Sequence, residues 1–154
     1  MKAFILAAGD GMRLRPLTSN IPKPLLLTAG KPFLQHTIEA LRAAGIKEMV
    51  ILVGWMGKRV EEEFGDGKRL GVKISYLTQH QRLGTAHAIG LSREFFKETF
   101  LCVNGDVLVS KGLAKDLLAF AKKVRGHVMA LSQVPNPTEY GVITLMGSMV
   151  TGIV

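Results

Sequence analysis

The sequence predicts an α/β fold, built from a mostly parallel sheet with helices on both faces. Short runs that are apolar throughout alternate with segments of helical periodicity, and such strands are typical of a sheet covered on both sides. The 154 residues are 47% apolar and 21% charged, which is enough for a proper hydrophobic core. No repeat, low-complexity tract or linker divides the chain. We therefore expect one domain over residues 1–154 and no second domain.

The expected elements follow from local patterns. The runs "AFILAA" and "EMVILV" indicate buried strands, whereas Phe33, Ile38 and Leu41 recur at roughly helical spacing before Gly45 supplies a stop. A short charged helix is expected to end at the turn "GDG". Strands are expected at 3–8, 48–53, 73–77, 99–103 and 128–133, helices at 32–44, 56–64, 85–96 and 112–123, and a terminal hairpin at 142–145 and 149–154.

The formal net charge of +8 suggests an anionic partner. The cations are scattered, and no nucleic-acid motif or aromatic platform accompanies them, so we expect no nucleic-acid partner. No stretch approaches the ~20 apolar residues of a membrane span, and the N-terminus does not resemble a signal peptide, so no membrane partner is expected. The single cysteine, Cys102, is expected in the core. Since no disulfide framework is possible, a reducing cytoplasm is the expected location.

Three unusual segments follow expected strands, at 9–18, 79–85 and 104–107. Ligands of open parallel sheets bind beyond the carboxyl ends of the strands. We therefore expect these three segments to share one cleft.

The first of these segments suits a phosphate. Gly9 and Gly11 allow close approach of the backbone, and Arg13 and Arg15 add charged donors that match phosphate oxygens. Lys23 lies between two prolines, which restrict the directions it can take. The third glycine of the dinucleotide fingerprint and the G-K-[ST] of the P-loop are both absent. The plain alternative for the two glycines is a strand-ending turn.

The stretch "LAAGDGMRLRPLT…PKPLL" resembles the signature of sugar-phosphate nucleotidyltransferases, L-A-A-G-x-G-T-R-L-x-P-L-T followed by P-K-P. The resemblance implies a Rossmann-like nucleotide-diphospho-sugar transferase fold. One departure is that a methionine replaces the usual threonine of the signature. The nucleotide contacts that the resemblance implies in this stretch are Leu6, Ala7, Ala8, Gly9, Gly11, Met12 and Arg13.

Three later segments resemble the same family. In "YLTQHQRLGTAHAI", the implied nucleotide contacts are Gln79, whose amide would read a pyrimidine edge, with Gly84 and Thr85; an ordinary helix entry is the alternative. In "FLCVNGDVLV", Asp106 would bind Mg²⁺, and a turn cap is the alternative. In "PTEYGVI", Gly141 would approach the sugar.

The resemblance implies that a sugar 1-phosphate attacks the α-phosphorus of a nucleoside triphosphate and releases pyrophosphate. The catalytic residues would be Arg13, which serves the triphosphate and leaving group, and Lys23, which bridges the α-phosphate. "LAAG" and "LGTAHA" are more similar to the uridylyl- and thymidylyl-transferring branches, so UTP or dTTP is favoured.

Family catalytic domains are longer than this chain, so we expect the N-terminal, nucleotide-binding part of the domain, in truncated form. The segment expected to supply sugar-phosphate contacts and a second acidic metal ligand is not in the sequence. The alternative to an enzyme is a non-catalytic module that binds nucleotide or partner subunits. A homo-oligomer is compatible with either.

Overall fold

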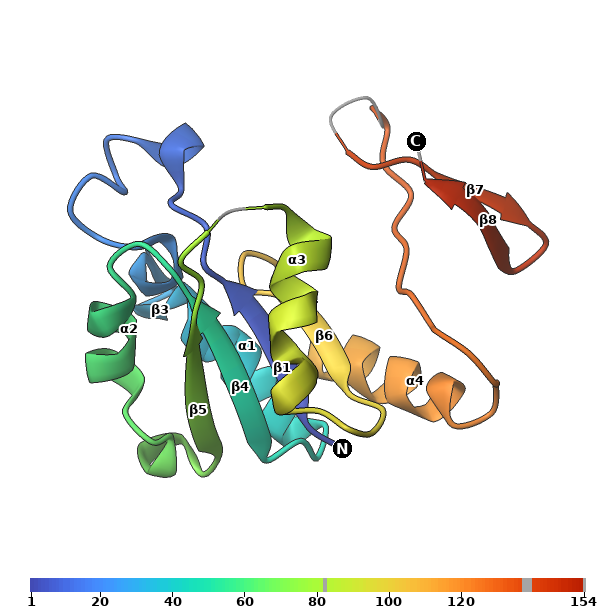
Figure 1. Cartoon of the computed structure of the whole chain (residues 1–154), viewed down its shortest axis with the longest axis horizontal. Coiled ribbons are helices and arrows are strands. Elements are labelled where there is room, and N and C mark those ends of the chain that lie inside the picture. Colours follow the sequence, from blue (N-terminus) through green and yellow to red (C-terminus); the bar gives the residue numbers. More distant parts are fainter. Residues whose placement is uncertain (82, 137–139, 154) are drawn as a thin grey trace.

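The protein is built around a four-stranded parallel sheet (Figure 1), in a computed structural model that describes residues 1–81, 83–136 and 140–153. The order across the sheet is β5-β4-β1-β6, and β1 pairs with both β4 and β6, in register from Ala3 to Leu6. The predicted mostly parallel sheet is therefore confirmed. The strands are β1 (Ala3–Ala7), β4 (Glu48–Val53), β5 (Lys73–Thr78) and β6 (Leu101–Asn104).

The helices agree with the expected ones to within a few residues at most ends. One expected helix, at 85–96, is divided into an α-helix and a 3₁₀ turn. The helices are α1 (Phe33–Ala43), α2 (Gly57–Phe64), α3 (Thr85–Gly90) and α4 (Lys111–Ala121), and the 3₁₀ turns are η1 (Met12–Leu14), η2 (Lys23–Leu25), η3 (Lys68–Leu70) and η4 (Leu91–Glu94). Two small antiparallel pairs complete the fold, β2 (Leu27–Thr28) with β3 (Lys31–Pro32), and β7 (Ile143–Met146) with β8 (Met149–Ile153).

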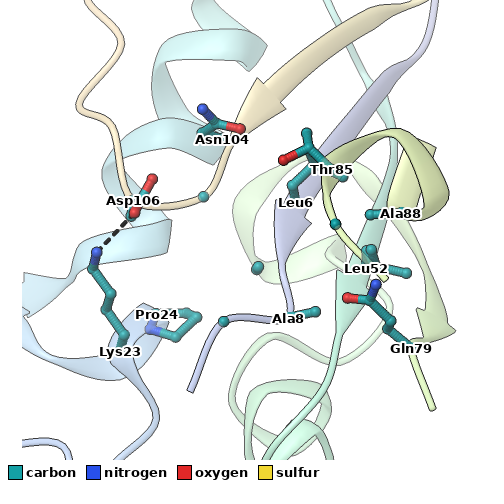
Figure 2. A pocket seen from close by; sticks show the side chains of 14 residues that line it. Leu6, Ala8, Lys23, Pro24, Leu52, Gln79, Thr85, Ala88, Asn104 and Asp106 are labelled. Carbon is teal, nitrogen blue, oxygen red and sulfur yellow. Dashed lines mark hydrogen bonds and ion pairs between the residues drawn. The ribbon is translucent and has the colours of Figure 1, made fainter. Parts of the chain in front are cut away.

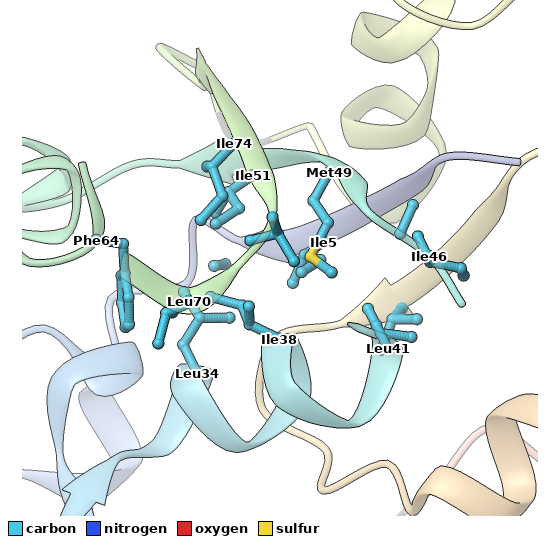
Figure 3. Packing of buried hydrophobic residues seen from close by; sticks show 14 of the residues in the cluster. Ile5, Leu34, Ile38, Leu41, Ile46, Met49, Ile51, Phe64, Leu70 and Ile74 are labelled. Carbon is cyan, nitrogen blue, oxygen red and sulfur yellow. The ribbon is translucent and has the colours of Figure 1, made fainter. Parts of the chain in front are cut away.

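The sheet is covered on both faces, which explains why its strands are apolar throughout. Ile5 and its neighbours pack against Leu34, Ile38 and other side chains of α1 on one face (Figure 3). On the other face, Phe4 packs with α3 and with two further rings, and its ring centroid lies 5.8 Å from that of Phe96. Burial on both faces makes every residue of β1 part of one core or the other.

The expected strand at 128–133 is wrong, because the chain forms no regular structure there. After α4 the chain runs away from the sheet toward the β7–β8 hairpin, which confirms the expected terminal hairpin (Figure 1). Met129 and Leu131 are 53% and 47% exposed. An extended apolar segment becomes a strand only where another strand completes its hydrogen bonds, and none of the described strands lies beside it.

Cys102 lies on β6, at the edge of the sheet, and is exposed rather than part of the core. Partial burial still raises the pKa of its thiol. Among the described residues, we find no helix with the length and apolar character needed to cross a bilayer.

Candidate functional site

A cleft of about 380 Å³ opens at the carboxyl ends of the parallel strands (Figure 2). It lies where the strand order reverses, because the chain passes from β1 to β4 and β5 on one side and returns to β6 on the other. All three segments expected to share a cleft contribute to it. The cleft is lined by Leu6, Ala7, Ala8, Gly9, Lys23, Pro24, Leu52, Gln79, Gly84, Thr85, Ala88, Asn104, Gly105 and Asp106.

Most of the residues singled out in the sequence as site candidates line this cleft, but five do not. Gly11, Met12, Arg13 and Arg15 belong to the loop that leaves the cleft after Gly9. Gly141 lies beside the β7–β8 hairpin, where a Cβ added to it would stand 3.8 Å from the Ile153 side chain. Three residues of the lining were outside the expected set, and these are Pro24, Leu52 and Ala88. Asn104 and Gly105 also line the cleft, within the segment 104–107 that was expected there.

The glycines of the first loop have different roles. A Cβ on Gly9 would meet no atom within 4 Å, so the backbone here faces open space in the cleft. Gly11 has a φ of +64°, and a Cβ there would lie 2.9 Å from the Thr18 side chain. The buried Thr18 hydroxyl donates a hydrogen bond of 2.7 Å to the Gly11 carbonyl. The loop is thus closed on itself by Thr18, while Gly9 leaves room for a ligand.

Close contact between backbones positions the acidic residue of the site. The N–H of Gly105 donates a 2.8 Å hydrogen bond to the carbonyl of Leu6 on β1. A Cβ on Gly105 would stand 2.8 Å from that same oxygen, so only glycine fits without a shift. The next residue, Asp106, is thereby held at the end of β6. Thr37 of α1 also donates a 3.2 Å hydrogen bond to the carbonyl of Val107, which fixes the far side of this turn.

Lys23 and Asp106 form an ion pair at one end of the cleft, with 2.8 Å between Nζ and Oδ2 (Figure 2). The two residues are 83 positions apart in the sequence. Lys23 opens η2, between Pro22 in an extended conformation and the buried Pro24, as its flanking prolines suggested. The lysine side chain is 28% exposed and the aspartate 50%. Both groups are therefore within reach of a ligand in the cleft.

The other end of the cleft is less polar. The backbone N–H of Gln79 donates a 2.8 Å hydrogen bond to the Val53 carbonyl, which holds Gln79 at the end of β5. Gly84, with a φ of +88°, precedes α3, and Thr85 is the first helical residue. Figure 2 places Gln79, Leu52 and Ala88 together on the side opposite Lys23 and Asp106. The arrangement offers an amide beside apolar surface, suitable for a flat, partly polar ring.

The donor set fits a Mg²⁺ ion that is shared with a phosphate. Among the described residues, we find no group of three or more histidine, cysteine or acidic side chains that could hold a metal by themselves. Of the described residues that line the cleft, Asp106 is the one with an acidic side chain. Mg²⁺ commonly binds one or two carboxylates and completes its shell with phosphate oxygens and water.

Comparisons with known proteins agree with this geometry. A glucose-1-phosphate thymidylyltransferase of Streptomyces griseus is 41% identical over 151 residues, which cover 96% of this chain and 42% of that protein. A mannose-1-phosphate guanylyltransferase of Mycobacterium tuberculosis is 40% identical over 143 residues, covering 92% of this chain and 40% of that protein. The chain thus spans about two fifths of the length of these curated relatives.

A solved structure has the same fold. It is that of a Bacillus anthracis protein assigned as a glucose-1-phosphate thymidylyltransferase and solved in complex with sucrose. The TM-score is 0.90 at 28% identity, over 99% of this chain and 63% of that one. The family model described as nucleotidyl transferase matches residues 2–154. The chain therefore belongs to the nucleotidyl transferase family.

Proposed function

We propose that this chain is the nucleotide-binding part of a sugar-1-phosphate nucleotidyltransferase. The reaction joins a sugar 1-phosphate to the α-phosphorus of a nucleoside triphosphate, and the bond to pyrophosphate breaks. One observation carries the proposal: Lys23, Gln79 and Asp106, from three distant parts of the sequence, line one cleft at the carboxyl edge of the sheet. A cation, a carboxylate and a base-sized apolar slot are the parts that a bound triphosphate requires.

The polarity of the cleft orients the nucleotide. The base lies against Leu52 and Ala88, with the Gln79 amide at its edge and Gly84 allowing close approach to the ring. The phosphates extend past Gly9, where the backbone faces open space, toward Lys23 and Asp106. In this pose the nucleotide runs across the carboxyl ends of β1 and β6, as ligands do at the switch points of other α/β sheets.

The proposed reaction does not require a general base. A sugar phosphate has a second pKa of about 6, so its attacking oxygen is already largely anionic at neutral pH. The chain's own task is to hold two anions together and to balance the charge that develops on the departing pyrophosphate. Lys23 serves this purpose at the α-phosphate. Bound Mg²⁺, held by Asp106 and by phosphate oxygens, would supply further charge neutralisation.

Three further proposed contacts lie outside the lining of the cleft. Arg13, in η1, is exposed, and we assign it to the outer phosphates that leave as pyrophosphate. Met12, beside it, offers the phosphates a backbone N–H but no hydroxyl. Gly141 is assigned to the sugar, in keeping with the "YG" segment that suggested it.

We further propose that the enzyme prefers UTP or dTTP. The support is the "LAAG" of the first loop and the amide of Gln79, which offers a donor and an acceptor together to a pyrimidine edge. The names of the relatives cover a thymidylyltransferase and a guanylyltransferase, so the family alone leaves the base open.

Calorimetric titration of the chain with UTP, dTTP, GTP and ATP, each with and without Mg²⁺, tests these proposals. We expect magnesium-dependent binding that favours UTP or dTTP. Tight binding of GTP instead would refute the base preference alone. If the folded chain bound none of the four nucleotides, the proposed catalytic function would fail and a non-catalytic module would become the better explanation.

A further inference from the structure

The Lys23–Asp106 ion pair joins the two charged groups for which the proposed function has separate uses. Lys23 Nζ lies 2.8 Å from Asp106 Oδ2, the distance of a charge-assisted hydrogen bond. In the proposed reaction Lys23 contacts a phosphate and Asp106 contacts a metal ion. The ion pair occupies one oxygen of the carboxylate and one donor of the ammonium group, so it competes with both contacts.

The pair competes most directly with the metal. Without a nucleotide, a divalent cation that approaches Asp106 finds one carboxylate oxygen already bonded to the Lys23 ammonium group. The positive charge of that ammonium group also repels the cation. A nucleotide changes this balance, because its phosphates attract the lysine and also supply oxygen ligands to the metal. The side chains are 28% and 50% exposed, so the exchange needs no opening of the core.

We propose that Lys23 acts as a placeholder on the metal ligand and makes metal binding depend on the nucleotide. This inference rests on the proposed function. Without nucleotide, Lys23 occupies Asp106 and lowers the affinity for a divalent cation. With nucleotide, the lysine transfers to the phosphates and the carboxylate becomes free. Because coupling between two ligands is reciprocal, the metal also strengthens nucleotide binding by the same factor.

The experiment measures Mn²⁺ binding by electron paramagnetic resonance of the free ion, without any nucleotide. Lys23→Met should bind Mn²⁺ about two- to fivefold more tightly than the wild type, the range expected for an exposed ion pair. Lys23→Arg keeps the charge and the donors and should stay close to the wild type. Asp106→Asn should lose the site in either background.

A matched control removes a lysine elsewhere. Lys68 forms an ion pair of the same 2.8 Å length with Asp66, and η3, which it opens, contributes nothing to the cleft. Lys68→Met therefore changes the net charge equally and should leave Mn²⁺ affinity at Asp106 unchanged. Circular dichroism verifies that every variant is folded.

The possible outcomes distinguish a failure of this inference from a failure of the proposed function. Equal Mn²⁺ affinity of Lys23→Met and wild type, in a chain that binds nucleotide, would overturn the placeholder and leave the proposed function standing. An equal gain in Lys68→Met would also overturn it, since the cause would be net charge. Absence of nucleotide binding with a gain confined to Lys23→Met would support the ion-pair competition and remove the proposed function.

Discussion

Replacing Gly105 by alanine tests how the fold positions the site. Gly105 has no positive φ, so alanine is not disfavoured by backbone conformation there. The cost is steric. A Cβ would lie 2.8 Å from the carbonyl oxygen of Leu6 and 3.0 Å from the Cβ of Ala7, both on the central strand β1.

The size of the effect follows from these distances. Ordinary van der Waals contacts of a Cβ begin near 3.4 Å, so β6 must move away from β1 by about half an ångström or the local backbone must tilt. Overpacking of this kind costs about 1–3 kcal/mol. The same shift displaces Asp106, the next residue, and alters the cleft wall formed by Leu6 and Ala7. We therefore expect lower stability and weaker magnesium-dependent nucleotide binding together.

The assay is urea unfolding followed by circular dichroism, together with calorimetric titration of the nucleotide. Gly90→Ala is the matched control, because Gly90 has helical φ and ψ and a Cβ there meets no atom within 4 Å. That variant should be unchanged or more stable by up to about 1 kcal/mol. Ordinary surface substitutions change the free energy of unfolding by up to about 0.5 kcal/mol. If the free energy of unfolding of Gly105→Ala differed from that of the wild type by less than this, the close approach of the two backbones would be refuted.

Three further predictions concern the loop, the alkaline limit and the reaction. Thr18→Val should destabilise the protein by about 1–2 kcal/mol in urea unfolding, since it leaves the Gly11 carbonyl without its buried donor, whereas Thr18→Ser should recover most of the loss. Burial, together with nearby carboxylates, raises the pKa of Tyr76 from its ordinary value of 10 to about 12. The protonated Tyr76 hydroxyl therefore stabilises the folded state fully below pH 10, and this stabilisation is lost between pH 10 and 12. Absorbance near 295 nm should show one of the two tyrosines ionising late, and a late step that survives in Tyr76→Phe would contradict the assignment. In a competent full-length enzyme, Arg13→Ala and Lys23→Ala should each lower pyrophosphate release by about 100-fold or more, and near-normal rates in a folded variant would disprove the role of that residue.

The sequence was sufficient to predict the sheet and the place of the cleft, because both depend on local patterns. Continuous apolar runs separated by helices predict parallel strands, and parallel strands bring their carboxyl ends to one edge. Gln79 and Asp106 could therefore be assigned to one cleft although they come from different strands. The ion pair between Lys23 and Asp106 could not be predicted in this way. Its partners are 83 positions apart, and no periodicity relates a loop after β1 to a turn after β6.

The segment at 128–133 shows that a local apolar pattern is not sufficient to predict a strand. It has the apolar content of the buried strands, yet it forms no strand, because a strand also requires a neighbour with free hydrogen-bonding groups. The exposed position of Cys102 has a related origin. The apolar run around it identified a strand correctly, but only the strand order places that strand at the edge of the sheet.

The cleft itself is shaped as much by backbone as by side chains. Gly105 brings the end of β6 against β1, and a Cβ on Gly54 would come within 2.5 Å of the Ala8 carbonyl, so β4 is held equally close on the other side. Between these contacts, Gly9 leaves an open stretch of backbone. Because substitutions other than proline keep the backbone N–H group, phosphate binding here should tolerate changes such as the methionine at position 12. It should fail when a glycine that sets the spacing of the strands is replaced.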